Sequence, residues 1–410
     1  MFNSKGIRYQ YIILGLFSLF IFFGATPQNK LNDTKQIDGY SKGAKQLIES
    51  AFEGLDSTKI LDYHMHILGM GDCNSGTSVN EEMLSYLHPL KHFKFNVYLS
   101  AAGIKHPQKA DAEYLTTLIS RIRNTPHHGK YCLLAFDQNY NIDGTPNIKK
   151  TEFFVPNDYV FWLSEQYPDL FIPVISIHPY RKDALAEIER WAYKGVHMVK
   201  WLPNAMNIDP SSKKCKDFYR RLKERKMILL THAGDEKAVD AEEDQKYGNP
   251  LLLKMPLDAG VKVIVAHCAS MGESSVKDSQ GMLIKRKNFD LFMQMMRDEK
   301  YEGLLFADIS AMTQYNRMEK PLTTMLDETA MHKRLVNGSD YPLPAIKMLI
   351  KTSSMEKEGY ITHDEGKYLN EIFKRNPLLF DFVLKRTIRS PITKRKFSPS
   401  VFMSNPLLEL

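Results

Sequence analysis

The feature that most constrains the fold is a long alternation of short apolar runs with longer amphipathic stretches, beginning at Ile60. The short runs are rich in β-branched residues and predict strands. Stretches such as DALAEIERWAYK and KDFYRRLKERK repeat their apolar residues at helical spacing and predict helices. An order of strand, helix, strand, helix favours parallel strands covered by helices. The number of repeats favours a closed ring of strands over an open sheet.

We therefore predict an α/β protein with a (β/α)8 barrel of the TIM type over residues 58–386. Nine runs compete for eight strands: ILDYHMHIL, FNVYLSAA, YCLLAFD, FIPVISIHP, GVHMVKWLP, MILLTHAG, VKVIVAHCA, GLLFADIS and RLVNGSD. FNVYLSAA, residues 95–102, is the expected extra strand. It lies in an insertion after the first barrel strand, residues 72–107, which could fold over the barrel mouth.

The N-terminus has the layout of an export segment. Lys5 and Arg8 precede the apolar run YIILGLFSLFIFFGA, and a polar stretch follows. Residues 1–26 are predicted to be a signal peptide or a membrane anchor. The run is slightly short for a spanning helix, which favours a signal peptide, but no clean small-x-small cleavage site precedes Thr26, so an anchor with a transmembrane helix is the alternative. The protein is accordingly expected to be exported or membrane-anchored, on the periplasmic or extracytoplasmic side. Residues 27–57 are predicted to form a linker and a short helix.

Composition is that of an ordinary globular protein, with 43% hydrophobic and 25% charged residues in a chain of 410. The net charge of +7 is raised by a cluster of basic residues that begins at Lys385 and continues into residues 387–410. We interpret this region as a solvated basic tail. We expect no nucleic-acid partner, since a basic patch alone is weak evidence for one. The four cysteines are too scattered for a disulfide framework. The basic cluster comprises Lys385, Arg386, Arg389, Lys394, Arg395 and Lys396.

Polar residues stand where several predicted strands end. Side chains at the carboxyl ends of barrel strands converge on one mouth, and buried imidazoles and charges are costly unless they share a partner. A divalent metal would be that partner, and nitrogen with carboxylate ligands suits zinc, with manganese or iron as alternatives. Individually, Asp340 could be a helix cap and Lys200 a snorkelling lysine. The candidates are His64, His66, Lys200, His232, His267 and Asp340.

The two histidines of the first strand occupy alternate positions in LDYHMHILGMG. Side chains alternate between the faces of an extended strand, so His64 and His66 should point the same way. Gly69 and Gly71 would then let the chain turn sharply away. One strand can therefore supply two ligands to one ion.

Five motifs make the chain resemble the amidohydrolase superfamily, within its amidohydrolase-related (amidohydrolase-2) branch. They are DYHMH at 62–66, GVHMVKWLP at 195–203, LLTHAGDE at 229–236, VIVAHCASMG at 263–272 and NGSDYP at 337–342. The resemblance spans residues 58–386. It does not cover the N-terminal segment or the basic tail, and the insertion after His66 is longer than the family pattern requires.

The resemblance implies a metal held by His64, His66, His232 and Asp340. It implies that His267 binds a second metal or contacts the substrate and the attacking water. Lys200 would bridge two ions if it is carboxylated, and would otherwise contact the substrate. One ion or two are both compatible with the sequence.

The function expected from these residues is metal-dependent hydrolysis, in which a metal-activated water attacks an amide, ester or lactone of a small molecule. Asp340 would act as general base. One alternative is a metal-dependent decarboxylase or hydratase of a small aromatic or unsaturated acid, and another is an inactive, membrane-tethered binding protein. Lys105, His106 and Arg181 would favour an acidic substrate, or are solvated loop charges. The sequence does not indicate the substrate or the oligomeric state.

Overall fold

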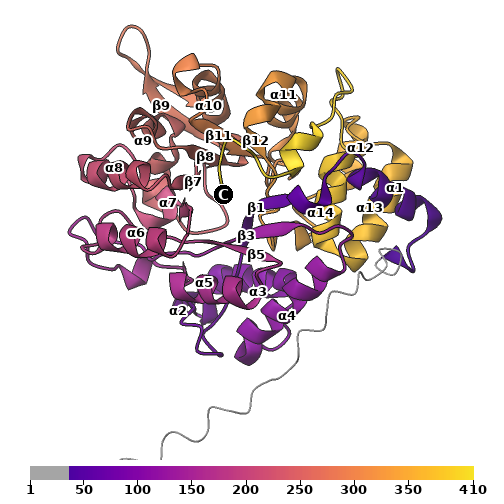
Figure 1. Ribbon diagram of the computed structural model, residues 1–410, viewed down its shortest axis with the longest axis horizontal. Coiled ribbons are helices and arrows are strands. Elements are labelled where there is room, and N and C mark those ends of the chain that lie inside the picture. The colour runs from indigo at the N-terminus through magenta and orange to yellow at the C-terminus, as the bar shows by residue number, and fades with distance from the viewer. Residues whose placement is uncertain (1–36) are drawn as a thin grey trace, which may run out of the picture.

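A ring of eight parallel strands lies at the centre of the computed structural model, which describes residues 37–410 (Figure 1). The first three strands form one sheet and the last five another. Parallel bridges between Ile175 and Val199, and between Met65 and Tyr341, join the two sheets at both seams. The predicted α/β fold is confirmed. The strands are β1 (Leu61–His66), β3 (Lys130–Leu134), β5 (Phe171–Val174), β6 (Met198–Trp201), β7 (Ile228–His232), β8 (Val263–Ala266), β11 (Leu305–Asp308) and β12 (Leu335–Val336).

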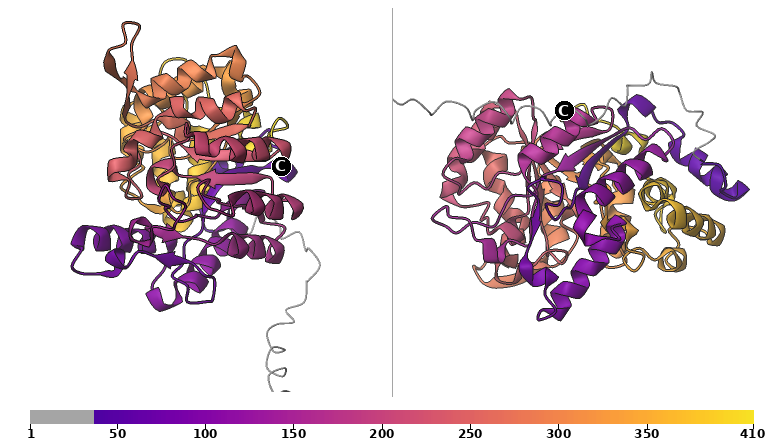
Figure 2. Two further views of the ribbon diagram at one scale, coloured as in Figure 1. Left: turned by 90° about the vertical axis from the view of Figure 1, so that its left-hand side faces the viewer. Right: turned by 90° about the horizontal axis from the view of Figure 1, so that it is seen from below.

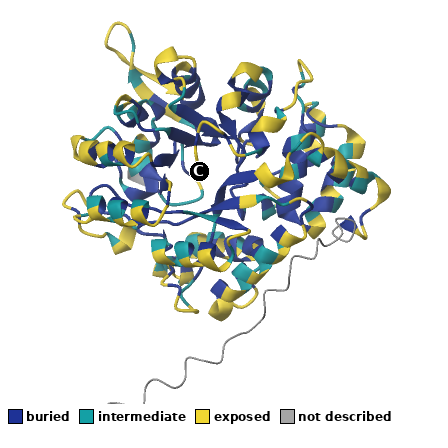
Figure 3. Cartoon of the chain, viewed as in Figure 1, coloured by how far each residue is buried: buried dark blue, intermediate teal, exposed yellow. Residues whose placement is uncertain are grey.

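Helices surround the ring and cover its outer face. Figure 3 shows buried strands at the centre and exposed residues on the outward sides of the helices. In α6, Ala184, Ile188 and Trp191 are buried, which is the spacing of a single helix face. The longer helices are α1 (Lys42–Phe52), α3 (Pro89–Ala102), α4 (Ala110–Arg123), α5 (Asn157–Gln166), α6 (Ala184–Tyr193), α8 (Lys216–Glu224), α10 (Asn288–Met296), α13 (His363–Arg375) and α14 (Pro377–Thr387).

Shorter elements complete the loops. Two antiparallel pairs lie outside the ring, β2 (Ser78–Val79) with β4 (Phe153–Phe154) and β9 (Glu273–Lys277) with β10 (Leu283–Lys287). The short helices are α2 (Glu81–Leu84), α7 (Pro203–Met206), α9 (Lys254–Asp258), α11 (Thr323–Asp327) and α12 (Thr352–Lys357).

Every second residue of a barrel strand faces the interior of the ring. Met198, Leu230 and Phe306 belong to one apolar cluster inside the ring, whereas their neighbours Val199, Leu229 and Ala307 pack between strands and helices. A side chain two positions after an interior residue therefore faces the interior again, one layer nearer the carboxyl ends of the strands. Those positions are Lys200, His232 and Asp308.

The insertion after β1 contains a helix where a ninth strand was expected. Residues 95–102 lie within α3, so that prediction is wrong. Phe95, Leu99 and Ala102 are buried at intervals of three and four residues, so the segment has one helical face. Gly103 ends the helix in the left-handed conformation at φ 80°. Figure 2 shows the indigo and purple helices of this region gathered on one side of the ring.

The interpretation of the C-terminal residues as a solvated tail is only partly right: Lys394, Arg395 and Lys396 are exposed, but other parts of the segment pack against the ring. Leu408 is 2% exposed and joins the apolar cluster inside the ring, near the C-terminus marked in Figure 1. The amide of Ser404 donates to the carbonyl of Lys59, which precedes β1, so the segment closes the amino end of the ring. Lys385 is fully buried because its ammonium is 2.5 Å from Asp381 Oδ2 and 2.6 Å from the carbonyl of Gly338.

The predicted localisation also needs correction. Among residues 37–410, no helix is both long and apolar enough to cross a membrane, and nothing in the structure or in the similarities reported below indicates export. This finding contradicts the expectation of an exported or membrane-anchored protein. The predicted signal peptide or anchor, residues 1–26, lies outside the described residues.

Candidate metal centre

Three of the predicted ligands form a compact triangle at the carboxyl end of the ring. The Nε2 atoms of His64 and His66 are 3.2 Å apart. Asp340 Oδ1 lies 3.2 Å from His66 Nε2 and 3.5 Å from His64 Nε2. Ligand atoms about 2.0 to 2.1 Å from one tetrahedral ion are about 3.3 Å from each other. The three side chains are therefore spaced as ligands of a single ion would be.

The chain leaves β1 through the two glycines singled out in the sequence. A Cβ atom on Gly69 would lie 2.4 Å from Thr77 Oγ1 and 2.5 Å from Asp111 Oδ1. Gly71 has a φ of 82°, a conformation that a residue with a side chain rarely adopts. Both positions thus require glycine for the chain to turn away behind His66.

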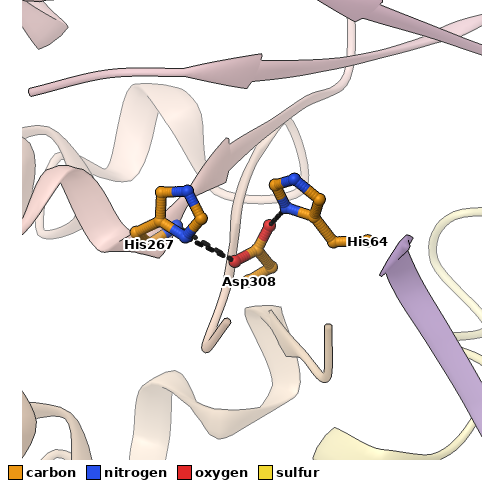
Figure 4. Close-up of side chains that lie close together, drawn as sticks. All are labelled: His64, His267 and Asp308. Carbon is orange, nitrogen blue, oxygen red and sulfur yellow. Dashed lines mark hydrogen bonds and ion pairs between the residues drawn. The ribbon is translucent and has the colours of Figure 1, made fainter. Parts of the chain in front are cut away.

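A second carboxylate, Asp308 at the end of β11, lies beneath the triangle and was not predicted. Its Oδ2 is 2.8 Å from His64 Nδ1, and its Oδ1 accepts the backbone N–H of His267 at 3.0 Å. Figure 4 shows Asp308 between the rings of His64 and His267. Ser310 Oγ lies 2.8 Å from His267 Nδ1. The signal was present, because Asp308 ends the run GLLFAD two residues after interior Phe306.

The other three predicted residues surround the triangle. The ammonium of Lys200 is 3.1 Å from His64 Nε2. His267 stacks on His64 with ring centroids 5.2 Å apart, and its Nε2 is 3.8 Å from Asp340 Oδ2. All six predicted site residues therefore lie at this end of the ring, with His232 the least tightly grouped.

His232 lies on β7, outside the compact groups formed by the other histidines and the two carboxylates. Its ring centroid is 5.4 Å from that of His267, and its Nδ1 is 3.5 Å from Glu236 Oε2. Its buried Nε2 has no hydrogen-bond partner in the described part of the chain. An unpartnered imidazole nitrogen beside a triangle of nitrogen and oxygen donors fits a divalent ion.

Burial and neighbouring charges put these groups in the protonation states that metal ligands need. Burial, together with the charge of Lys200, lowers the pKa of His64 to about 4. Burial also lowers the pKa values of His232 and His267. Burial alone would raise the pKa of Asp340, but His267, His64 and His66 outweigh it and lower that pKa. At neutral pH the imidazoles of His64, His232 and His267 are neutral and the carboxylate of Asp340 is ionised, as coordination requires.

The amine of Lys200 is less basic than an ordinary lysine. Burial lowers its pKa to about 8, against the opposing effect of Asp308 and Asp340. About a tenth of the Lys200 side chains are therefore uncharged at pH 7. An uncharged amine is the form that can act as a nucleophile or a ligand.

A buried arginine, also not predicted, lies near these groups. Arg317 is 8% exposed, its Nη1 donates to Ser270 Oγ at 2.9 Å, and its buried Nε has no partner in the described part of the chain. Within residues 37–410 it forms no ion pair. Its charge contributes to lowering the pKa values of His232 and His267. Because Arg317 lies in an irregular segment between β11 and α11, no strand-end signal marks it.

Of the three basic residues considered for an acidic substrate, Arg181 and His106 are paired within the chain, and Lys105 is exposed. Arg181 lies 3.0 Å from Asp137 and 2.8 Å from Asp183. His106 lies 2.5 Å from Glu113. These side chains have carboxylate partners within ion-pair distance, whereas Arg317 does not, although Glu236, Asp340 and Asp308 act on its charge from farther away.

Solved structures of several proteins are similar to this chain. One is an uncharacterised TIM-barrel protein from Bordetella bronchiseptica, with 16% identity and a TM-score of 0.47 over 77% of this chain and 100% of that one. Another is a putative 2-pyrone-4,6-dicarboxylic acid hydrolase from Pseudomonas putida, with 13% identity, a TM-score of 0.41 and coverage of 82% and 96%. A third is a 5-carboxyvanillate decarboxylase from Sphingomonas paucimobilis, with 8% identity, a TM-score of 0.44 and coverage of 80% and 96%. No curated protein matches the chain.

A family model described as amidohydrolase matches residues 133–349, more than half of the chain. The matched range runs from β3 past β12 and includes Lys200, His232, His267 and Asp340. It begins after β1, so the two histidines of that strand lie outside it. On this match, and as its motifs indicated, the chain belongs to the amidohydrolase family, in the amidohydrolase-2 branch.

Proposed function

We propose that the protein is a metal-dependent hydrolase that cleaves an amide, ester or lactone bond of a small molecule with an activated water. The observation that carries the proposal is the triangle of His64 Nε2, His66 Nε2 and Asp340 Oδ1, whose sides of 3.2 to 3.5 Å match the ligand spacing of one ion. His232 would complete the set from β7. Zinc suits these donors, with manganese or iron as alternatives.

A bound divalent ion would act as a Lewis acid and lower the pKa of a water molecule toward about 7. The remaining roles belong to the chain. Asp340 is ionised, and its second carboxylate oxygen, Oδ2, lies 3.8 Å from His267 Nε2, so this oxygen can accept a proton from the water and pass it to the leaving group. His267, whose Nδ1 lies next to Ser310 Oγ, would direct Nε2 at the oxygen of the group under attack.

Lys200 has two roles that its geometry supports. Its nitrogen is 3.1 Å from His64 Nε2, and its pKa of about 8 leaves uncharged amine available to react with carbon dioxide. A carboxylated Lys200 would bridge two ions, and an unmodified one would contact the substrate. Carboxylation of Lys200 would therefore favour two ions per chain over one.

A competing function in a different class of reaction uses the same residues. Arg317 is a buried cation that forms no ion pair in the described chain, although Glu236, Asp340 and Asp308 act on its charge from farther away. A substrate carboxylate would provide a direct partner. A small carboxylic acid held in this way could be decarboxylated or hydrated instead of hydrolysed, with Asp340 moving a proton to or from carbon. Decarboxylation and hydration would both need the metal, and both would place the carboxylate of the substrate at Arg317.

Elemental analysis tests the metal site. The purified protein should contain stoichiometric zinc, manganese or iron, and His66→Ala should lose it. His106→Ala, which removes an exposed imidazole outside the ring, should retain the metal. Equal metal content in all three proteins would contradict the assigned ligands.

A substrate screen separates the two reactions. Lactones, esters and N-acyl compounds should be hydrolysed, whereas release of carbon dioxide from aromatic carboxylates would support the competing reaction. Arg317→Met should raise KM for anionic substrates in either case, and Arg181→Met should not. A metal-loaded protein that turns over none of these compounds would instead support the inactive binding protein.

A further inference from the structure

Five large apolar side chains are exposed on the helices of the insertion after β1. They belong to α2, to the turn after it and to the first half of α3, and are between 41% and 89% exposed. The next densest stretch of the described chain, around the start of β10, exposes three such side chains. Figure 2 shows the insertion helices on one side of the ring. We call these five residues the α2–α3 patch: Leu84, Tyr86, Leu87, Leu90 and Phe93.

The helix α3 is apolar on two different faces. Its inner face buries Phe95, Leu99 and Ala102 against the rest of the chain. Leu90 and Phe93 lie three residues apart on its outer face, and both are exposed. A helix that is apolar all round is normally covered all round. Residues 37–410 cover only the inner face, so the outer face is left for a partner from outside this chain.

The side chains of the patch are held in place before any partner binds. The Tyr86 ring packs on the His92 ring with centroids 4.5 Å apart, and His92 Nδ1 lies 3.2 Å from the carbonyl oxygen of Met83. The backbone N–H of Leu87 donates to Ser85 Oγ at 3.1 Å. Groups that are already ordered lose less entropy when they bind, so this arrangement favours a stable contact.

The lysines beside the patch are paired within the chain. Lys91 lies 2.7 Å from Glu82 and 3.3 Å from Asp240. Lys94 lies 3.9 Å from Glu152. Surfaces that bind anionic lipids or nucleic acids instead direct basic residues at the partner's charges. The α2–α3 patch is therefore better suited to another apolar protein surface.

The area of the patch is close to one half of a dimer interface. With about 150–250 Å² for a large side chain, the exposed fractions give a surface on the order of 700 Å². The largest apolar patch on a typical monomer is about 300–600 Å². A stable interface takes about 800 Å² from each partner. Two copies of the patch, placed face to face, would come close to that requirement.

We propose that two copies of this chain form a dimer in which the α2–α3 patch of one docks on the same patch of the other about a two-fold axis. Two-fold dimers are the commonest homo-oligomers, and such an interface uses the same surface on both copies. The inner side of α3 packs against the turn Leu343–Ala345, so the interface would also support the loop that follows Asp340. The proposal does not depend on the proposed hydrolysis, because the mass of the protein is measured without turnover.

Sedimentation velocity on the full-length protein tests the proposal. The wild type should form a dimer with a dissociation constant of about 1 µM or below, because interfaces of this size range from micromolar to picomolar affinity. Leu90→Glu places like charges in the apolar interface and should raise the dissociation constant about 100-fold or more. Leu283→Glu, the same change at a leucine of β10 that is 73% exposed, should leave the dimer intact.

Leu87→Glu repeats the test before the start of α3 and decides the matter if Leu90→Glu does not fold. The proposal is overturned if the wild type is monomeric at about 100 µM, if the folded patch variants dimerise as tightly as the wild type, or if Leu283→Glu weakens the dimer as much as they do. A monomeric wild type that binds phosphatidylcholine vesicles, with binding lost in Leu90→Glu, would assign the patch to a lipid surface and overturn the proposal as well.

Discussion

The candidate metal centre and the C-terminal segment, residues 377–410, both bury charged groups against the same ring, but they satisfy them differently. In the C-terminal segment two cations have carboxylate partners from the chain: Lys385 has Asp381, and Arg389 has Glu365. In the first pair, only the second oxygen of Asp381, Oδ1, has no hydrogen-bond partner among the described residues. At the metal centre His64, His66 and Asp340 crowd one point, and the buried Nε2 of His232 has no partner in the described chain. The comparison distinguishes charged groups that stabilise the fold from charged groups that are arranged to bind a ligand from outside the chain.

Replacing Asp340 should produce the largest effect and should act on function rather than folding. Asp340→Asn keeps the shape of the side chain but removes both the ionised ligand and the proposed base. Loss of a general base alone costs about 10²- to 10⁴-fold in rate, so kcat/KM should fall at least that far and metal content should drop. Asp278→Asn, in the turn of the β9–β10 hairpin, is the matched control. Unchanged metal content in Asp340→Asn would remove the distinction between the two regions.

Replacing Lys385 should have the opposite character, a loss of stability with the metal retained. Lys385→Met leaves Asp381 buried without its cation, which should lower the free energy of unfolding by about 3–5 kcal/mol. Denaturant unfolding measures the loss, and Lys367→Met on the exposed face of α13 should cost almost nothing. A variant that kept its stability but lost metal would show that the pair serves the centre.

The pH dependence of the same variant sharpens the test. Burial raises the pKa of Asp381 from 3.8 to about 6, even with the opposing effect of Lys385. The folded state therefore holds a proton that the unfolded state has released, and stability falls as the pH rises through about 4 to 6. Without Lys385 the folded pKa should rise further. The stability deficit of Lys385→Met should consequently be larger at pH 7 than at pH 5.

Leu408 offers a purely apolar comparison at the closed amino end of the ring. Leu408→Ala removes a side chain that is 2% exposed and should cost about 2–3 kcal/mol of unfolding free energy. Leu407→Ala, at a neighbour that is 43% exposed, should cost far less. Metal content should be the same in both, because the two ends of the ring are separated by its apolar interior. Equal stability of the two variants would argue against closure by the C-terminal segment.

The strand order and most of the site could be predicted because both depend on local periodicity. Lys200 and His232 follow interior apolar residues by two positions, and the sequence alone shows this spacing. Asp308 obeys the same rule, although the site predicted from the sequence does not include it. The failures come from features that depend on tertiary contacts or irregular backbone. Lys385 resembles a solvated charge in the sequence, because only the fold shows that it is buried against Asp381. Arg317 lies in a segment without helix or strand periodicity, so no sequence pattern marks it.

Asp308 should give the smallest of the effects, because it acts on the ion through His64. Its Oδ1 accepts the backbone N–H groups of His267 and Ser310, each at 3.0 Å, and its Oδ2 faces His64 Nδ1. In Asp308→Asn the amide oxygen would remain with the backbone donors, so the NH₂ group would face His64 Nδ1. That arrangement moves the ring proton to Nε2, the nitrogen that points at His66 and Asp340.

Metal affinity should therefore fall about 10- to 100-fold in Asp308→Asn, the usual cost of removing a carboxylate that orients a ligating histidine. Competition with a chelator measures the affinity, and ¹⁵N NMR of the imidazoles reads the tautomer of His64 directly. Ser310→Ala removes an uncharged neighbour of His64 Nδ1, the Ser310 hydroxyl, and should change the tautomer of His64 much less. If Asp308→Asn kept the wild-type tautomer and affinity, the carboxylate would belong with the paired charges of the C-terminal segment rather than with the metal centre. A changed tautomer with reduced affinity would place Asp308 within the metal centre, as a group that positions the ligand His64 through a hydrogen bond.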